Sequence, residues 1–179
     1  QMAAGADDLL QNACVVDGLS EALRDEFKAQ ELNLDAIPEF TLNMSGCPNT
    51  CGMHHVADLG FFGKIGRKEG QIYPAYNVLA GAQTGAGKTR YAQKEGEIAS
   101  KFVPSFVCDF LSDYIEQKDE YDTYHEYLDK EGRALIHTLC EKYKDVPTKE
   151  EDESYYIDFG AKRGLRLDDM GTAECSAGM

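Results

Sequence analysis

Residues 76–89, YNVLAGAQTGAGKT, decide how the fold of this 179-residue chain is interpreted. An apolar run typical of a strand leads into a glycine-rich segment that ends in Gly87, Lys88 and Thr89. This pattern fits the loose form of a phosphate-binding loop, in which backbone N–H groups hold phosphates. Such a loop opens directly into a helix, whereas a plain glycine-rich turn leads into another strand.

The residues that follow favour the turn. After Thr89 the sequence RYAQKEGEIASKF has few apolar positions, Gly96 in its middle and no helical stripe. A nucleotide hydrolase also needs an aspartate after an apolar strand to hold magnesium. The one candidate, Asp109, lies within the strongest helical pattern of the chain. We therefore expect a turn between strands with Lys88 and Arg90 on the surface, and keep a P-loop-like nucleotide binder as a minor alternative.

Apolar spacing predicts helices at both ends of the globular part. Apolar residues four apart predict a short amphipathic helix over about Gly18–Glu31. Pro104 suits the first turn of a helix whose i, i+3, i+4 stripe runs to Ile115. A further helix is expected over Tyr121–Tyr143. The last stretch, from Asp145, predicts a mostly irregular tail held to the body by Tyr155, Tyr156, Ile157 and Phe159.

The strands are expected between these helices. Phe40, Leu42 and Met44 alternate with polar residues, which predicts a strand ending at the loop GCPNTCG. Residues 56–66, VADLGFFGKIG, and 70–82, GQIYPAYNVLAGA, continue the strand region. The order of elements predicts an α+β fold, with an antiparallel or mixed sheet, packed helices, a C-terminal helical extension and an irregular tail. We expect a boundary between an α+β domain at 1–117 and the helical extension with its acidic tail at 118–179.

Charge and cysteine usage narrow the function classes. The formal net charge is −14 and the pI about 4.6, which argues against nucleic-acid binding and against docking on an anionic membrane. No apolar run approaches the roughly 20 residues that span a bilayer. The segment 1–12 carries two aspartates and no basic residue, unlike an export signal. Six scattered cysteines then predict mostly reduced thiols and a cytoplasmic protein.

Chemistry is concentrated in the loop after the first expected strand. Cys47 and Cys51 form a Cys-x3-Cys pair, and Pro48 and Gly52 bend the chain so that both sulfurs can face one site. Two thiolates suit a soft metal or an iron–sulfur cluster, and spacing alone leaves two unligated buried thiols equally open. The following pair, residues 54 and 55, are histidines and could in principle complete a zinc site. Adjacent histidines point in different directions, so we expect one to pack and the other to be solvated.

The loop and the segments after it resemble a known enzyme family. Residues 46–64, GCPNTCGMHHVADLGFFGK, are similar to the second cysteine motif of the sirohaem and [4Fe-4S] nitrite/sulfite reductases. Residues 76–116 resemble that family's glycine-rich sheet segment and the helix behind it, and 155–179 resemble the C-terminal extension of some members. The resemblance implies the C-terminal part of such a reductase, with 1–117 a partial sirohaem/iron–sulfur domain.

The resemblance also implies cofactors, site residues and a reaction. Family members hold the cluster with a Cys-x5-Cys pair and a Cys-x3-Cys pair, and Cys47 and Cys51 match the second pair. The thiolate at the Cys51 position would also bridge the cluster to the sirohaem iron, and Asn49 in the same motif is carried over as cofactor-binding. The implied reaction is the six-electron reduction of sulfite to sulfide or of nitrite to ammonia. The implied electron donor is one such as ferredoxin, acting through the complete enzyme.

The chain departs from the family pattern in its missing first cysteine pair. If Cys14 is aligned as the first ligand, its partner position is Ser20, so two thiolates remain where four are needed. We do not expect Cys108, Cys140 or Cys175 to substitute. One local basic group, a solvated face or an anion site, comprises Lys64, Arg67, Lys68, Lys88 and Arg90. The sequence thus predicts a fragment or subunit, inactive alone and completed by the remainder of a reductase or a second subunit. The alternative is a metal-free relative that serves as a structural or interaction module.

Overall fold

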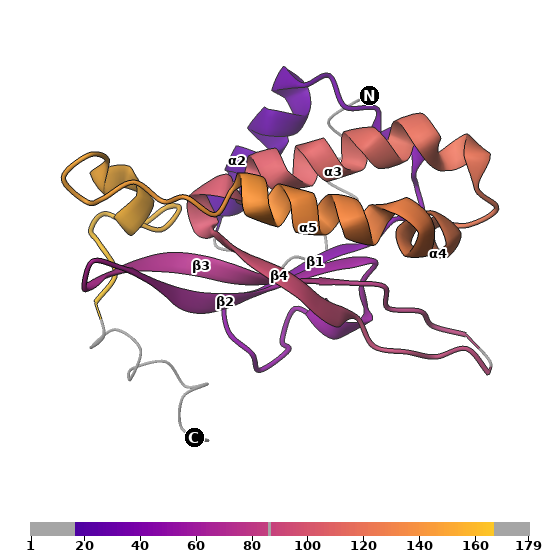
Figure 1. The fold of residues 1–179 in the computed structure, drawn as a ribbon, viewed down its shortest axis with the longest axis horizontal. Helices are drawn as coiled ribbons and strands as arrows, with labels where there is room; N and C mark the ends of the chain where they lie inside the picture. Colours follow the sequence, from indigo (N-terminus) through magenta and orange to yellow (C-terminus); the bar gives the residue numbers. More distant parts are fainter. Residues whose placement is uncertain (1–16, 86, 167–179) are drawn as a thin grey trace.

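The fold was analysed in a computed structural model, which describes residues 17–85 and 87–166. Cys14 and Cys175 lie outside these residues. A twisted sheet forms one layer, and helices drawn from both ends of the chain form a second layer on one of its faces (Figure 1). The predicted α+β class is confirmed.

The sheet is mixed, as one of the two predicted alternatives. Its strand order is β1-β2-β3-β4, with β1 parallel to β2 and the other neighbours antiparallel. The strands are β1 (Leu42–Ser45), β2 (Leu59–Lys68), β3 (Gln71–Ala80) and β4 (Gln93–Ala99). The second and third are joined by a tight turn at Glu69 and Gly70, both with positive φ.

The parallel pair requires a crossover connection, because both strands begin at the same end of the sheet and the chain must return to that end. Residues 46–58 make this crossover and include the 3-10 turn His54–Val56. A hydrogen-bonded clamp fixes where it ends. The Asp58 carboxylate accepts bonds from the Thr41 backbone N–H at 2.9 Å and from the Thr41 hydroxyl at 2.8 Å. The backbone N–H of Asp58 donates to the same hydroxyl at 2.9 Å.

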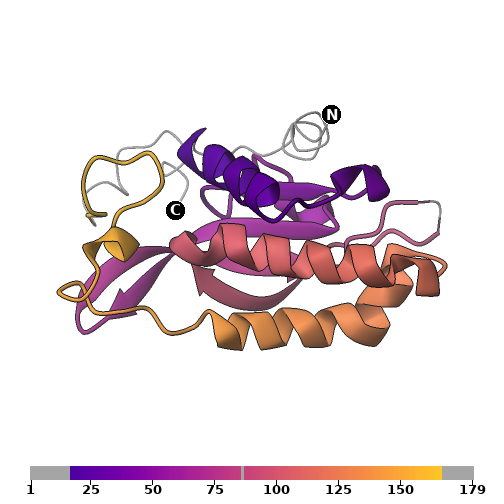
Figure 2. The same cartoon turned by 90° about the horizontal axis from the view of Figure 1, so that it is seen from above.

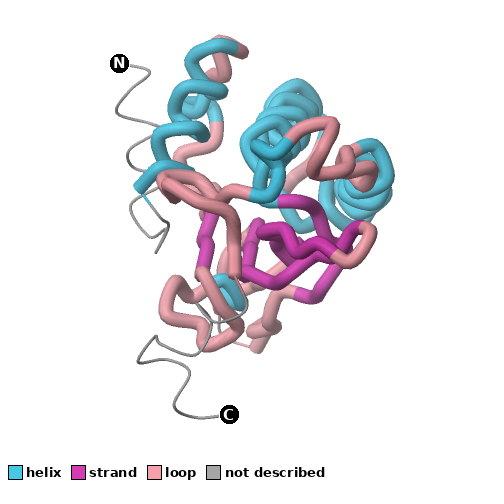
Figure 3. The backbone as a smooth tube through the Cα atoms, turned by 90° about the vertical axis from the view of Figure 1, so that its left-hand side faces the viewer, coloured by secondary structure: helices cyan, strands magenta, loops and turns pink. Residues whose placement is uncertain are grey.

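Three helices cover one face of the sheet. They are α2 (Asp17–Ala29), α3 (Val103–Gln117) and α5 (Arg133–Lys142), and α3 lies between the other two (Figure 2). The helix predicted over 121–143 forms as α4 (Tyr124–Tyr127), a π turn and α5. Seen end-on, the long helices lie on one side of the strands, and the other side carries mostly loops (Figure 3). The remaining short turns are Leu34–Ala36, Ser100–Phe102, Lys118–Glu120, Glu153–Tyr156 and the π turn Leu128–Gly132.

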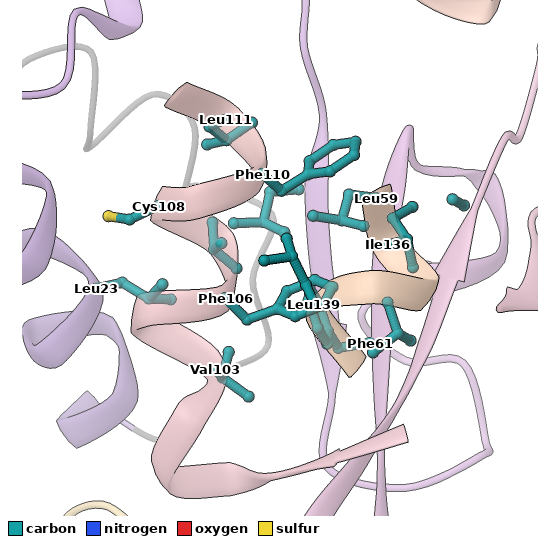
Figure 4. Packing of buried hydrophobic residues seen from close by; sticks show 14 of the residues in the cluster. Leu23, Leu59, Phe61, Val103, Phe106, Cys108, Phe110, Leu111, Ile136 and Leu139 are labelled. Carbon is teal, nitrogen blue, oxygen red and sulfur yellow. The ribbon is translucent and has the colours of Figure 1, made fainter. Parts of the chain in front are cut away.

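The core lies between the helices and the sheet. Phe106 of α3 meets Phe61 of β2 edge to face, with ring centroids 6.0 Å apart, and both are fully buried. Leu23 of α2 and Ile136 and Leu139 of α5 close the same cluster from either side (Figure 4). Both sides of the expected 117/118 boundary therefore contribute to one core, and the domain boundary itself stays a prediction.

The end of the described chain is held to the body, as expected. Tyr156 is 2% exposed, and its ring centroid lies 6.0 Å from that of Tyr73 on β3. The Ser100 hydroxyl donates to Asp158 at 2.9 Å. Within residues 17–85 and 87–166, no helix has the length and apolar character needed to cross a membrane.

Truncating the central aromatic contact should destabilise the fold strongly. Phe106→Ala is expected to lower the free energy of unfolding by about 3–5 kcal/mol, since it removes a buried ring and leaves a cavity. Tyr91→Ala, at a side chain that is 69% exposed, should change it by less than about 0.5 kcal/mol. Urea denaturation of both variants measures the difference. Equal shifts would contradict the assignment of the core.

Candidate functional site

The glycine-rich segment is a continuation of a β-hairpin. Gln83 and Arg90 exchange two backbone hydrogen bonds of 2.9 Å, which extend the pairing of β3 with β4. The Thr89 hydroxyl donates to the Gly85 carbonyl at 2.9 Å, and the segment leads into a strand. A phosphate loop would instead open into a helix. The predicted turn, with Lys88 and Arg90 exposed, is confirmed.

This geometry predicts that the segment binds no nucleotide. Calorimetric titration of the chain with magnesium-ATP should give no saturable heat, and Lys88→Ala should give the same trace. A saturable signal in the wild type that Lys88→Ala abolishes would contradict this account and restore the nucleotide-binding alternative.

The cysteine loop lies on the sheet face that the helices leave open. Neighbouring residues of a strand point to opposite faces. Phe61 points to α3, whereas Phe62 stacks on His54, with ring centroids 5.0 Å apart. The crossover that carries Cys47 and Cys51 therefore runs over the opposite face (Figure 1). Cys47 is partly buried and Cys51 is exposed, and both are free thiols.

Glycines let this loop lie against the strands. A Cβ atom on Gly52 would sit 1.9 Å from the Met44 carbonyl oxygen, and one on Gly63 would sit 2.2 Å from that of Gly46. Neither space admits a side chain. Thr50 and Met53 adopt left-handed backbone, with φ of 63° and 51°. Such conformations are unfavourable for residues other than glycine, so surrounding contacts must hold the loop in shape.

A layer of buried polar side chains lies beneath the loop. The Ser45 hydroxyl accepts from the Gly52 backbone N–H at 3.0 Å and lies 2.7 Å from Nδ1 of His54. Asn43 donates through Nδ2 to the Met53 carbonyl at 3.2 Å. Both β1 residues are about as buried as their apolar neighbours, at 5% exposed for Asn43 and 2% for Ser45. Alternation identified the core face of β1, but not the loop that covers its other face.

His54 is fully buried in this layer, and His55 is partly buried. Burial, helped by the nearby His55, lowers the pKa of His54 to about 4, so the imidazole is neutral at pH 7. His54 is thus the member of the pair that packs, as expected for one of the two histidines. No group of three or more His, Cys, Asp or Glu residues in the described part of the chain is arranged to hold a metal ion.

The loop therefore offers a donor set of two thiols. Sγ of Cys51 lies 4.0 Å from the Asn49 carbonyl oxygen within the turn, and Cys47 begins the same turn. Thiolates are ligands of iron–sulfur clusters, and two of them fit half of a four-cysteine set. The roles of Cys47, Cys51 and Asn49 toward a cofactor remain proposals.

The other described cysteines are structural in character. Cys108 is buried on α3 beside α2, and burial raises the pKa of its thiol to about 12 (Figure 4). Cys140 on α5 packs over Gly96, and burial raises the pKa of its thiol to about 11. High pKa values keep both thiols protonated, which suits packing better than metal ligation.

The basic residues do not form one unpaired patch. Lys64 forms an ion pair with Glu97 across the sheet. Arg90 donates through Nε to the Gly81 carbonyl at 3.0 Å and lies 3.7 Å from the Asp129 carboxylate. Two of the five predicted residues are thus committed to neighbouring groups.

Comparison with known proteins gives the loop a context. The chain is 33% identical over 87 residues to the ferredoxin–nitrite reductase of Synechococcus elongatus, covering 49% of this chain and 15% of that protein. It is 22% identical over 107 residues to the assimilatory ferredoxin-dependent nitrite reductase of Haloferax mediterranei, covering 60% and 18%. It is 28% identical over 94 residues to the sulfite reductase [NADPH] hemoprotein beta-component of Bacillus subtilis, covering 52% and 15%. No family model matches the chain.

A solved structure supports the fold. The NirA protein of Mycobacterium tuberculosis superposes with a TM-score of 0.57 at 18% identity, over 66% of this chain and 22% of that chain. Over part of its length the chain is thus similar to nitrite and sulfite reductases, and the likeness to NirA, at 18% identity, supports the fold alone. The chain matches less than a fifth of the length of these curated relatives.

The buried imidazole predicts a pH-dependent stability. In the unfolded chain, His54 becomes protonated as the pH falls below its ordinary pKa of 6.5. In the folded chain, where its pKa is about 4, it stays neutral until the pH falls to about 4. The unfolded state then binds more protons, so the free energy of unfolding falls as the pH falls through this window. His54→Gln should lose less stability than the wild type between pH 6.5 and 4 in urea denaturation. Parallel pH profiles would show that His54 does not carry this dependence.

Proposed function

We propose that this chain is the C-terminal fragment or a subunit of a sirohaem- and [4Fe-4S]-dependent nitrite/sulfite reductase. In this proposal Cys47 and Cys51 supply two of the four cluster thiolates, and another segment or chain supplies the others. The observation that carries the proposal is the Cys-x3-Cys crossover loop on the open sheet face, in a chain similar to reductases of both kinds.

The local structure supports ligation by this loop. Cys51 is exposed and Cys47 is partly buried, so both thiols lie near the surface, where a cluster shared with another polypeptide would sit. Gly52 and Gly63, where a Cβ atom would clash with the carbonyl oxygens of Met44 and Gly46, let the turn lie close to β1 and β2. Such close support limits the motion of the backbone that carries both cysteines. Preorganised ligands bind metals more tightly than mobile ones.

The bound cofactors would supply electron storage and a metal that binds sulfite or nitrite. The contribution of this chain is to hold two thiolates and, through Asn49 in the same turn, to contact the cofactor. Sulfite or nitrite would receive six electrons in the complete enzyme, from a donor such as ferredoxin. Two of the similar proteins carry ferredoxin in their names, which supports that choice.

The alternative is a metal-free relative that acts as a structural or interaction module. The absence of a second cysteine pair among residues 17–85 and 87–166 favours it, whereas the intact Cys47–Cys51 turn favours the reductase. The two hypotheses differ in iron content, because only the first needs a cluster.

Iron content of cysteine variants tests the proposal. The chain should be purified without oxygen from cells that make sirohaem, together with any polypeptide that accompanies it. We expect about four irons and matching acid-labile sulfide per assembly. Cys47→Ser and Cys51→Ser should each lose most of both, because serine is a poor ligand for iron–sulfur clusters.

Cys140→Ser is the matched control, since it removes a thiol from α5 away from the loop. It should retain the iron and sulfide of the wild type. A folded, iron-free wild type would favour the metal-free module. Iron that persists in Cys51→Ser would contradict ligation by this loop.

A further inference from the structure

We propose that Ser45 and His54 form a positioning pair that fixes the Cys47–Cys51 turn for metal binding. The inference rests on the proposed function and extends it to residues that ligate nothing themselves. The Ser45 hydroxyl contacts both Gly52, the residue directly after Cys51, and His54.

The first step is the tether itself. Ser45 ends β1, two residues before Cys47, and its hydroxyl accepts from the Gly52 N–H at 3.0 Å. The bond joins the two sides of the turn that carries both thiols. No side chain fits at Gly52, whose Cβ position lies 1.9 Å from the Met44 carbonyl oxygen. The return side of the turn therefore lies directly on the end of β1.

The second step is the anchor of the tether. Nδ1 of His54 lies 2.7 Å from the Ser45 hydroxyl, and Ser45 either donates to it or accepts from it. The imidazole is 0% exposed and stacks on Phe62 at 5.0 Å. Its backbone lies over Gly60, where a Cβ atom would be 2.1 Å from the His54 carbonyl oxygen. The ring is thus held by packing and can fix the orientation of the hydroxyl.

The third step is that packing alone does not account for a histidine here. Nε2 of His54 is buried and has no hydrogen-bond partner in the described part of the chain, and Asn43 Oδ1 is in the same state. A buried polar atom without a partner costs free energy, which a phenylalanine of similar size would avoid. We therefore assign the function of the imidazole to the contact that its Nδ1 atom makes with Ser45.

The turn needs such a tether because its backbone is unfavourable. Thr50 and Met53, on either side of Gly52, have positive φ. Asn43 adds a third anchor through its 3.2 Å bond to the Met53 carbonyl. Without Ser45, the turn could relax toward ordinary backbone, and the backbone that carries the two cysteines would no longer be fixed. The chemical class of ligand affected is a soft, thiolate-binding metal.

The test uses Cd²⁺ as a probe, on the reduced chain free of iron and oxygen. Thiolate-to-metal absorption in the ultraviolet reports binding, and competition with a chelator gives the affinity. The wild type should bind one Cd²⁺ through the turn, and Cys51→Ser should abolish that site. Ser45→Ala and His54→Phe should each weaken binding by about tenfold or more, as loss of a residue that orients ligands does in other metal sites.

Two comparisons separate positioning from general stability. Ser100→Ala removes another buried serine hydroxyl, 1% exposed and bonded to Asp158, and should lower the melting temperature while leaving Cd²⁺ affinity unchanged. If Ser45 and His54 act as one unit, the double variant Ser45→Ala/His54→Phe should bind about as well as the weaker single variant. His54→Asn, whose amide can replace Nδ1, should recover most of the lost affinity.

The outcomes distinguish this inference from the proposed function. Wild-type affinity in both folded single variants, with the Cys51→Ser site lost, would overturn the positioning pair and leave the cysteine ligands standing. A loss of affinity in Ser100→Ala equal to that in Ser45→Ala would also overturn it, because stability alone would explain both. Cd²⁺ binding that Cys51→Ser does not change would overturn the metal role of the turn and the positioning pair with it.

Discussion

The parallel pairing of β1 with β2 is the constraint on which the rest of the structure depends. Two consecutive strands that pair in parallel cannot be joined by a tight turn. Residues 46–58 must therefore run back across a face of the sheet from the end of β1 to the start of β2. The helices occupy one face, which leaves the other for this crossover. Thr41 and Asp58 hold the two ends of the pairing together by three hydrogen bonds. The position of the cysteine turn follows from this topology.

The two cysteines lie in the loop, but residues of the strands beneath it hold the loop in place. Ser45, Phe62 and Gly63 come from β1 and β2, and each contacts the crossover that passes above them. A turn with two left-handed residues would be mobile in isolation, and here it lies on a rigid support. The same arrangement leaves Cys51 exposed, so the thiols could complete a site with a second polypeptide while their backbone stays fixed.

Much of the fold could be predicted from local pattern. The stripe from Pro104 to Ile115 gave α3, and the lack of a helical stripe after Thr89 identified a turn between strands. The parallel direction of β1 could not be predicted, because strand pairing is set by contacts distant in sequence. Nor could the burial of Asn43 and Ser45, since alternation does not reveal what covers the second face. The motif identified Cys47 and Cys51, whereas the structure was needed to find the Ser45–His54 contact beneath them.

The central claim is that the Cys47–Cys51 turn ligates an iron–sulfur cluster. The most direct measurement is to locate iron by anomalous scattering in a crystal of the assembly purified without oxygen. The account predicts a compact group of iron atoms on the open sheet face, bonded to Sγ of both cysteines. Iron bound elsewhere, or two unligated thiols in a well-folded, iron-free protein, would contradict it and leave the chain as a module without a metal.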